Sequence, residues 1–192
     1  MQTPWSEQIL VYRLYEERSA EAFGELYDRY VQPIYRYIAF KVRTTTEAED
    51  MTAEVFLKTW EYVQRREKKI ENFRAFLYNL ARNAVVDYYR HQAKQDIVKE
   101  QEEMAQIPAP AEHQISVLVE LNSDMAMIER GLRGLKDEYR EVLILRYIED
   151  YSIVDIAAIM EKSRGAVRVN LHRAINALRE EVKKIESEVG AK

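Results

Sequence analysis

Residues 152–174, SIVDIAAIMEKSRGAVRVNLHRA, have the pattern of two short helices joined by a tight turn. Apolar residues recur at helical spacing on both sides of the polar run 162–165, namely Ile153, Ile156, Ala157 and Met160 before it and Val167, Leu171, Ala174 and Leu178 after it. This arrangement is typical of a helix-turn-helix, whose second helix lies in the major groove of DNA. We therefore predict a helix-turn-helix over this stretch.

The charge of the chain is uneven. The formal net charge is -4, whereas a protein that binds DNA strongly by itself is basic, because phosphate neutralisation supplies most non-specific affinity. Residues 64–95, however, hold 8 basic and 3 acidic side chains, and residues 162–184 hold 7 and 2. Two basic segments in an acidic chain predict two limited contacts with nucleic acid, with a second partner supplying the remaining affinity.

The composition favours an all-α fold. Of the 192 residues 47% are hydrophobic and 32% charged, with only 5 Gly and 4 Pro, and no strand-like alternation precedes residue 95. We expect two helical domains, residues 1–95 and 125–192, the second a four-helix domain containing the helix-turn-helix. Residues 96–124, acidic and with Pro108 and Pro110, predict a flexible linker.

Several function classes are disfavoured. The chain has no cysteine for disulfides, thiolate chemistry or zinc, and His91, His113 and His172 are scattered. The sequence contains no catalytic triad, metal-ligand motif or glycine-rich phosphate loop. We therefore expect that the protein is not an enzyme and binds no cofactor or metal ion. The start lacks the pattern of a signal peptide, and no apolar run approaches the ~18 residues of a membrane span, so we expect a cytoplasmic protein.

Two segments together resemble regions two and four of bacterial sigma factors. They are AEDMTAEVFLKTW at residues 48–60 and LKDEYREVLILRYIEDYSIVDIAAIMEKSRGAVRVNLHRAINAL at residues 135–178, with Asn-Phe-Arg-Ala-Phe at residues 72–76 between them. The length and the short linker are similar to the small extracytoplasmic-function (ECF) class. The resemblance covers roughly residues 20–95 and 125–182. It implies a subunit that binds core RNA polymerase, directs it to promoters and assists promoter melting.

The resemblance implies that Asp50 and Glu54 bind the polymerase. In the family, an acidic helix of region two binds a coiled coil on the largest catalytic subunit, and the polymerase flap is a further contact. Asp50 and Glu54 are four residues apart and so share one helix face. The sequence departs from the family at Ala53, where glutamine is common, and the alternative reading of the pair is a solvated helix start.

The first basic segment corresponds to the part of region two that captures the minus-ten promoter element as separated strands. Cations that follow phosphates, beside groups that stack on or hydrogen-bond a base, suit single-stranded DNA. We expect Trp60, Phe76 and Tyr88 to pack in the core instead. The predicted minus-ten residues are Arg65, Arg66, Lys68, Lys69, Phe73, Arg74, Asn83 and Arg90.

The second basic segment corresponds to the recognition helix for the minus-thirty-five element. Ser163 is a natural N-cap, arginine can bond guanine through two hydrogen bonds, and Arg173 is placed to meet a phosphate. Asn170 stands where the family often has a basic residue, and the alternative role of the arginines is a solvated face. The predicted residues are Ser163, Arg164, Gly165, Arg168, Val169, His172 and Arg173.

The expected partners are core RNA polymerase, promoter DNA and an anti-sigma factor, the last because small sigma factors of this class are commonly held inactive by one. The alternative function is a helix-turn-helix regulator that binds DNA without polymerase. Such a regulator would need a sensor or receiver domain, typically α/β, and the first lobe has no strand pattern.

Overall fold

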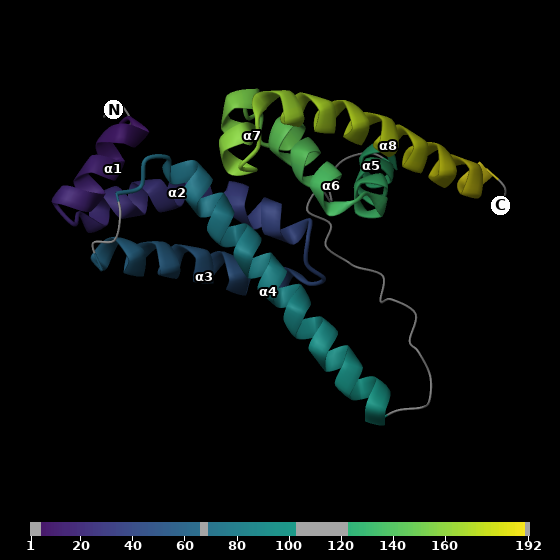
Figure 1. Ribbon diagram of the computed structural model, residues 1–192, viewed down its shortest axis with the longest axis horizontal. Helices are drawn as coiled ribbons and strands as arrows, with labels where there is room; N and C mark the ends of the chain where they lie inside the picture. Colours follow the sequence, from purple (N-terminus) through teal and green to yellow (C-terminus); the bar gives the residue numbers. More distant parts are fainter. Residues whose placement is uncertain (1–4, 66–68, 103–122, 191–192) are drawn as a thin grey trace. The chain divides into compact units, whose positions relative to one another are not determined.

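The computed structural model describes residues 5–65, 69–102 and 123–190, which form two compact units, Met1–Ile115 and Ser116–Lys192 (Figure 1). Within the described residues every regular element is a helix. The prediction of an all-α chain with two helical domains is therefore confirmed.

The first unit contains α1 (Glu7–Glu16), α2 (Ala20–Ala39), α3 (Thr45–Gln64) and α4 (Phe73–Glu102). Side chains of Ser6, Ser19 and Thr44 cap the starts of α1, α2 and α3 by accepting hydrogen bonds from backbone N–H groups of the first turn. Helix α2 contacts the other three helices and forms the centre of the unit. The largest fully buried side chains here are Leu10, Leu14, Leu26, Ile34, Tyr37, Ile38, Phe73, Leu77 and Tyr78.

Helix α4 is longer than the sequence predicts. It continues to Glu102, so residues 96–102, which we assigned to the linker, are helical. The next part of the predicted linker, residues 103–122, lies outside the described residues.

The second unit contains α5 (Ser123–Gly134), α6 (Asp137–Leu143), the π-helical turn η1 (Ile144–Ile148), α7 (Ile153–Ile159) and α8 (Arg164–Gly190). Because η1 continues α6 without a break, the described part of this unit is the predicted four-helix domain. Helix α8 packs against α5, α6 and α7. The core is formed by Leu132, Leu135, Val142, Leu143, Ile144, Leu145, Ile156, Ile159, Val167 and Ala174.

Helices α7 and α8 form the predicted helix-turn-helix. Ser152 and Asp155 make a capping box that starts α7, with Ser152 Oγ 3.2 Å from the backbone nitrogen of Asp155. Glu161 then takes a left-handed conformation, with φ of 53°, that reverses the chain. Ser163 Oγ accepts a hydrogen bond of 3.1 Å from the backbone N–H of Ala166, which confirms Ser163 as the N-cap of α8.

Candidate functional site

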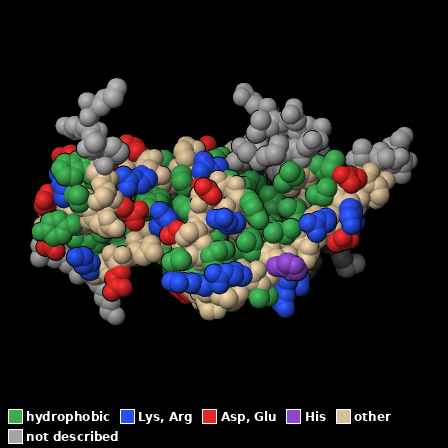
Figure 2. Space-filling model, turned by 90° about the horizontal axis from the view of Figure 1, so that it is seen from above, with side chains coloured by type: hydrophobic (Ala, Val, Ile, Leu, Met, Phe, Trp, Pro, Cys, Tyr) green, Lys and Arg blue, Asp and Glu red, His purple; other side chains and the backbone are tan. Residues whose placement is uncertain are grey.

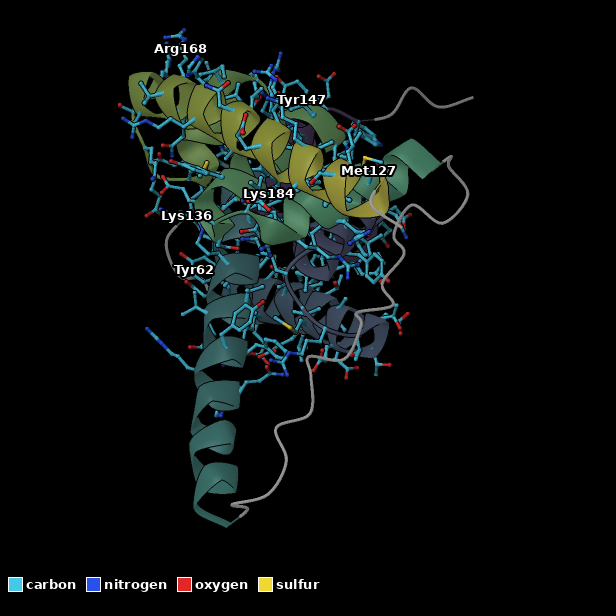
Figure 3. All side chains as sticks on the ribbon, turned by 90° about the vertical axis from the view of Figure 1, so that its right-hand side faces the viewer. Tyr62, Met127, Lys136, Tyr147, Arg168 and Lys184 are labelled. Carbon is cyan, nitrogen blue, oxygen red and sulfur yellow. The ribbon has the colours of Figure 1, made fainter. Side chains whose placement is uncertain are left out.

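The start of α8 presents a continuous exposed face. Val167 and Ala174 are fully buried, which fixes the rotation of the helix and turns the opposite side to solvent. Figure 3 shows Arg168 pointing outward near one end of α8, and Lys184 lies toward the other end. The exposed side chains here are the predicted Arg164, Arg168, Val169, His172 and Arg173.

Gly165, in the first turn of this helix, is not required by packing. A Cβ at Gly165 would meet only Ser163 Oγ, at 3.9 Å, which is ordinary contact, and its φ is not positive. A small residue here leaves space at the helix surface for another molecule to approach closely.

A carboxylate at the edge of this face was not predicted from the sequence. Glu138 of α6 accepts hydrogen bonds from Lys162 Nζ in the turn and from Asn170 Nδ2 on α8. These two hydrogen bonds, together with the positive charges of Lys162 and Arg173, hold the pKa of the Glu138 carboxyl below its usual value. The donors are 24 and 32 residues away in the sequence, which is why no local pattern revealed the cluster.

The exposed residues of the first basic segment lie on the loop before α4 and on one side of α4. Arg65 and Lys69 are exposed, whereas Arg66 and Lys68 lie outside the described residues. Asn83 and Arg90, seven residues apart on α4, are exposed on the same side with Val86 between them, and Arg90 pairs with Asp87 at 3.2 Å. In Figure 2, Lys and Arg side chains are interspersed with Asp and Glu side chains, in keeping with the mixed charge of the sequence.

Phe73 corrects the predicted minus-ten set. The Phe73 side chain is 1% exposed, and its ring lies 5.8 Å from that of Tyr30, so it belongs to the core and has no face on which a base could stack. Arg74 is half-buried and bonds the hydroxyl of Tyr30, which also donates to Glu7. Burial and the bond to Glu7 raise the pKa of Tyr30. Arg74 therefore ties α4 to α2.

The three aromatic residues assigned to packing are part-buried as expected. Trp60 lies 5.0 Å from Phe23, and Phe76 lies 4.8 Å from Tyr62, measured between ring centroids. Burial and a hydrogen bond to Glu47 raise the pKa of Tyr88 to about 12.

Helix α3 presents Asp50 and Glu54 to solvent on one side. Glu54 pairs with Lys58 at 2.6 Å, and Ala53 between the two acids is exposed as well. The side chain of Leu57 is 58% exposed and continues the same side of α3. The helix therefore offers two carboxylates and an apolar side chain to a partner.

An open pocket of about 300 Å³ adjoins this side of α3 and was not predicted. Its lining is almost wholly apolar, so it suits an apolar side chain of a partner rather than a charged ligand. It is lined by Ala20, Phe23, Tyr27, Phe56, Leu57 and Trp60. Because the lining comes from α2 and α3, periodicity within either helix could not identify it.

Two further observations concern the described residues as a set. None of their helices combines the length and the apolar character that a membrane span requires. No group of three or more of their His, Asp and Glu side chains is arranged to hold a metal ion.

Comparison with known proteins identifies two family matches. The family "Sigma-70 region 2" matches residues 26–95, and "Sigma-70, region 4" matches residues 125–178. The chain is 31% identical over 159 residues to the ECF RNA polymerase sigma factor BldN of Streptomyces coelicolor, covering 83% of this chain and 60% of BldN. It is 27% identical over 171 residues to the ECF sigma factor SigW of Bacillus subtilis, covering 85% of this chain and 90% of SigW.

Solved structures agree in fold. The sigma factor RpoE of Bartonella quintana, in complex with the anti-sigma factor NepR, has a TM-score of 0.63 at 22% identity and covers 85% of this chain and 98% of its own. CnrH, in complex with the cytosolic domain of CnrY, has a TM-score of 0.65 at 22% identity, and the match covers 93% of this chain and 97% of the CnrH chain.

Proposed function

Since the chain belongs to the ECF class of RNA polymerase sigma factors, we propose that it binds core polymerase in the cytoplasm, directs it to specific promoters and assists their melting. Members of this family are transcription initiation factors and not enzymes. The observation that carries this proposal is the presence of both sigma regions in one chain. Region two falls within the first compact unit and region four within the second. We assign residues 1–95 to region two, 96–124 to the connection and 125–192 to region four.

The exposed face of α8 reads the minus-thirty-five element in this proposal. Arg164 and Arg168 are exposed near the start of a helix of a size that enters the major groove, where arginine bonds guanine. Ser163 and Gly165 shape the helix start, Val169 and His172 extend the face, and Arg173 meets a phosphate. The exposure of these side chains supports the assignment.

The loop before α4 and the exposed side of α4 hold the minus-ten element as a single strand. Exposed cations at Arg65 and Lys69 suit its phosphates, and Arg66 and Lys68 extend that charge in the sequence. The Asn83 amide both donates and accepts, as base readout requires, and Arg90 lies on the same side of α4. Phe73 is left out because its side chain is buried, whereas Arg74, half-buried and bonded to Tyr30, stays in the proposed set.

The exposed side of α3 docks onto core polymerase. Asp50 and Glu54 supply negative charge, which steers a partner of opposite charge and sets its orientation. The adjacent pocket supplies apolar area, and the combination of apolar centre and charged surround is typical of protein interfaces. We assign this surface to the coiled coil of the largest catalytic subunit, and the second unit to the flap.

Gel filtration with core polymerase tests the function. We expect the full-length chain to co-elute with core polymerase and to bind promoter DNA tightly only in that complex, because its net charge of -4 provides little general attraction to DNA. Tight and specific promoter binding by the chain alone, without co-elution, would instead establish a stand-alone helix-turn-helix regulator.

An anti-sigma factor regulates this activity in our proposal. Support comes from two proteins of the same fold, RpoE and CnrH, each of whose structures contains a partner, NepR or the cytosolic domain of CnrY. Pull-down from the native cell should therefore recover a third protein beside polymerase under non-inducing conditions. Recovery of polymerase alone under both inducing and non-inducing conditions would contradict the proposal.

A further inference from the structure

One carboxylate connects three parts of the second unit. The same oxygen of Glu138, Oε1, accepts hydrogen bonds from Lys162 Nζ in the helix-turn-helix turn and from Asn170 Nδ2 on α8. We call these three residues the Glu138 cluster. Its members lie near the start of α6, in the turn and on the recognition helix, so the cluster joins elements that are distant in the sequence.

The cluster touches α8 at the edge of the exposed face. At about 100° per residue Asn170 lies between the exposed Arg173 and the buried Ala174, across the buried stripe from Arg168. A change in the position of Asn170 therefore changes the rotation of the whole exposed face relative to α6.

Stability alone does not account for the cluster. The Lys162 and Glu138 side chains are 35% and 45% exposed, and ion pairs at such positions contribute little to folding. An acidic side chain beside a face that binds DNA also opposes phosphate attraction. The carboxylate therefore has a role other than stability or charge. Because one oxygen accepts from both Lys162 and Asn170, it holds α6, the turn and α8 in one relative orientation.

We propose that Glu138 is a positioning residue for recognition of the upstream promoter element. By holding Lys162 and Asn170, it fixes α8 so that Arg164 and Arg168 meet base edges in one orientation, and it keeps Lys162 directed at protein rather than at a phosphate. The inference rests on the proposed function, because it requires that α8 bind DNA.

The test uses holoenzyme reconstituted from core polymerase and the full-length chain. Promoter fragments randomised in the upstream element are bound to the holoenzyme, recovered and sequenced. We define the preference as the enrichment of the best-bound sequence divided by the average enrichment of all sequences. Glu138→Ala should lower this preference about tenfold, the scale of one misplaced arginine–guanine contact. Glu138→Gln should retain most of it, because the amide oxygen still accepts from both donors.

Glu180→Ala is the matched control. It removes the same charge from the same unit and breaks a comparable exposed pair, Glu180 with Lys183 at 3.2 Å. Glu180 lies roughly 18 Å along α8 from Arg168, toward the end marked by Lys184 in Figure 3. The preference of this variant should equal that of the wild type.

Asn170→Ala provides an independent variant should Glu138→Ala fail to fold. Alanine favours the helix, so the substitution removes the bond without weakening α8. Asn170→Ala should also lower the preference. The double variant should show little further loss beyond Glu138→Ala alone, because both changes remove the same contact.

Three results would overturn the positioning role. The first is an unchanged preference with equally tighter binding to every fragment, which would mean that the carboxylate only repels phosphates. The second is a lowered unfolding temperature with unchanged preference, the sign of a purely structural residue. The third is an equal loss of preference in Glu138→Gln and Glu138→Ala, which would mean that the negative charge, and not the hydrogen bonds, is responsible.

A wild-type holoenzyme without any upstream preference would overturn the proposed function itself. This outcome is distinguishable from the three above because it affects the wild-type protein and not only the variants.

Discussion

Reversing the charges of Asp50 and Glu54 together, to lysine, is expected to weaken binding to core polymerase by about 100-fold or more. Both side chains are exposed on one side of α3, so each reversal replaces an attraction by a repulsion at the proposed docking surface. Helix content should stay unchanged, because the ion pair of Glu54 with Lys58 that the reversal breaks is exposed and contributes only a few tenths of a kcal/mol, roughly, to the helix. Affinity measured by titration of labelled chain with core polymerase, beside circular dichroism, tests both statements.

The matched control is the double variant Glu16→Lys with Glu17→Lys. It changes the net charge of the chain by the same amount and also breaks one exposed pair, Glu17 with Arg13, but its positions lie at the end of α1, to which we assign no polymerase contact. Its affinity for core polymerase should remain close to that of the wild type. Equal weakening in both double variants would indicate a general charge effect, and unaltered affinity of the Asp50 and Glu54 variant would refute the docking assignment.

The helix-turn-helix could be predicted from the sequence because its determinants are local. Apolar spacing within each helix sets which side is buried, and the hydroxyl of Ser163 caps the helix that starts one residue later. Buried Ile156, Val167 and Ala174 occupy the positions that the spacing indicates. Signals of this kind need no knowledge of the rest of the chain.

Phe73 could not be assigned correctly in the same way. Its sequence neighbours are cations, which suggested contact with nucleic acid, but the Phe73 ring packs beside that of Tyr30 on α2. The deciding contact lies 43 residues away in the sequence. Glu138 and the pocket between α2 and α3 were missed for the same reason, since each depends on contacts between helices.

The end of α4 could not be predicted because the composition of residues 96–102 fits a helix as well as a linker. Residues 96–102 are rich in Glu, Lys and Gln, which are strong helix formers and are also common in linkers. The sequence has no glycine C-cap or proline at residue 95 that would stop the helix there. A boundary based on charge alone therefore came too early.

The two proposed DNA surfaces should act on different states of the promoter. Arg168 is exposed on a helix that fits a closed major groove, whereas Asn83 lies on α4 beside cations suited to separated strands. Arg168→Ala should lower recruitment to the upstream element about tenfold or more, because it removes one arginine–guanine contact. Supplying an already melted bubble should not restore recruitment, because that contact is made to duplex DNA.

Asn83→Ala should fail at the later step. Polymerase should still reach the upstream element, but open-complex formation should fall, because the amide that hydrogen-bonds an unpaired base is gone. A melted template with its non-template bases intact should rescue only part of this defect, since it removes the cost of melting but does not replace the amide. Permanganate reactivity of thymines in the bubble, measured beside recruitment on the same promoter, separates the steps, and each variant is the control for the other. Failure of both variants at the same step would contradict the division of the chain into a duplex-reading unit and a strand-capturing unit.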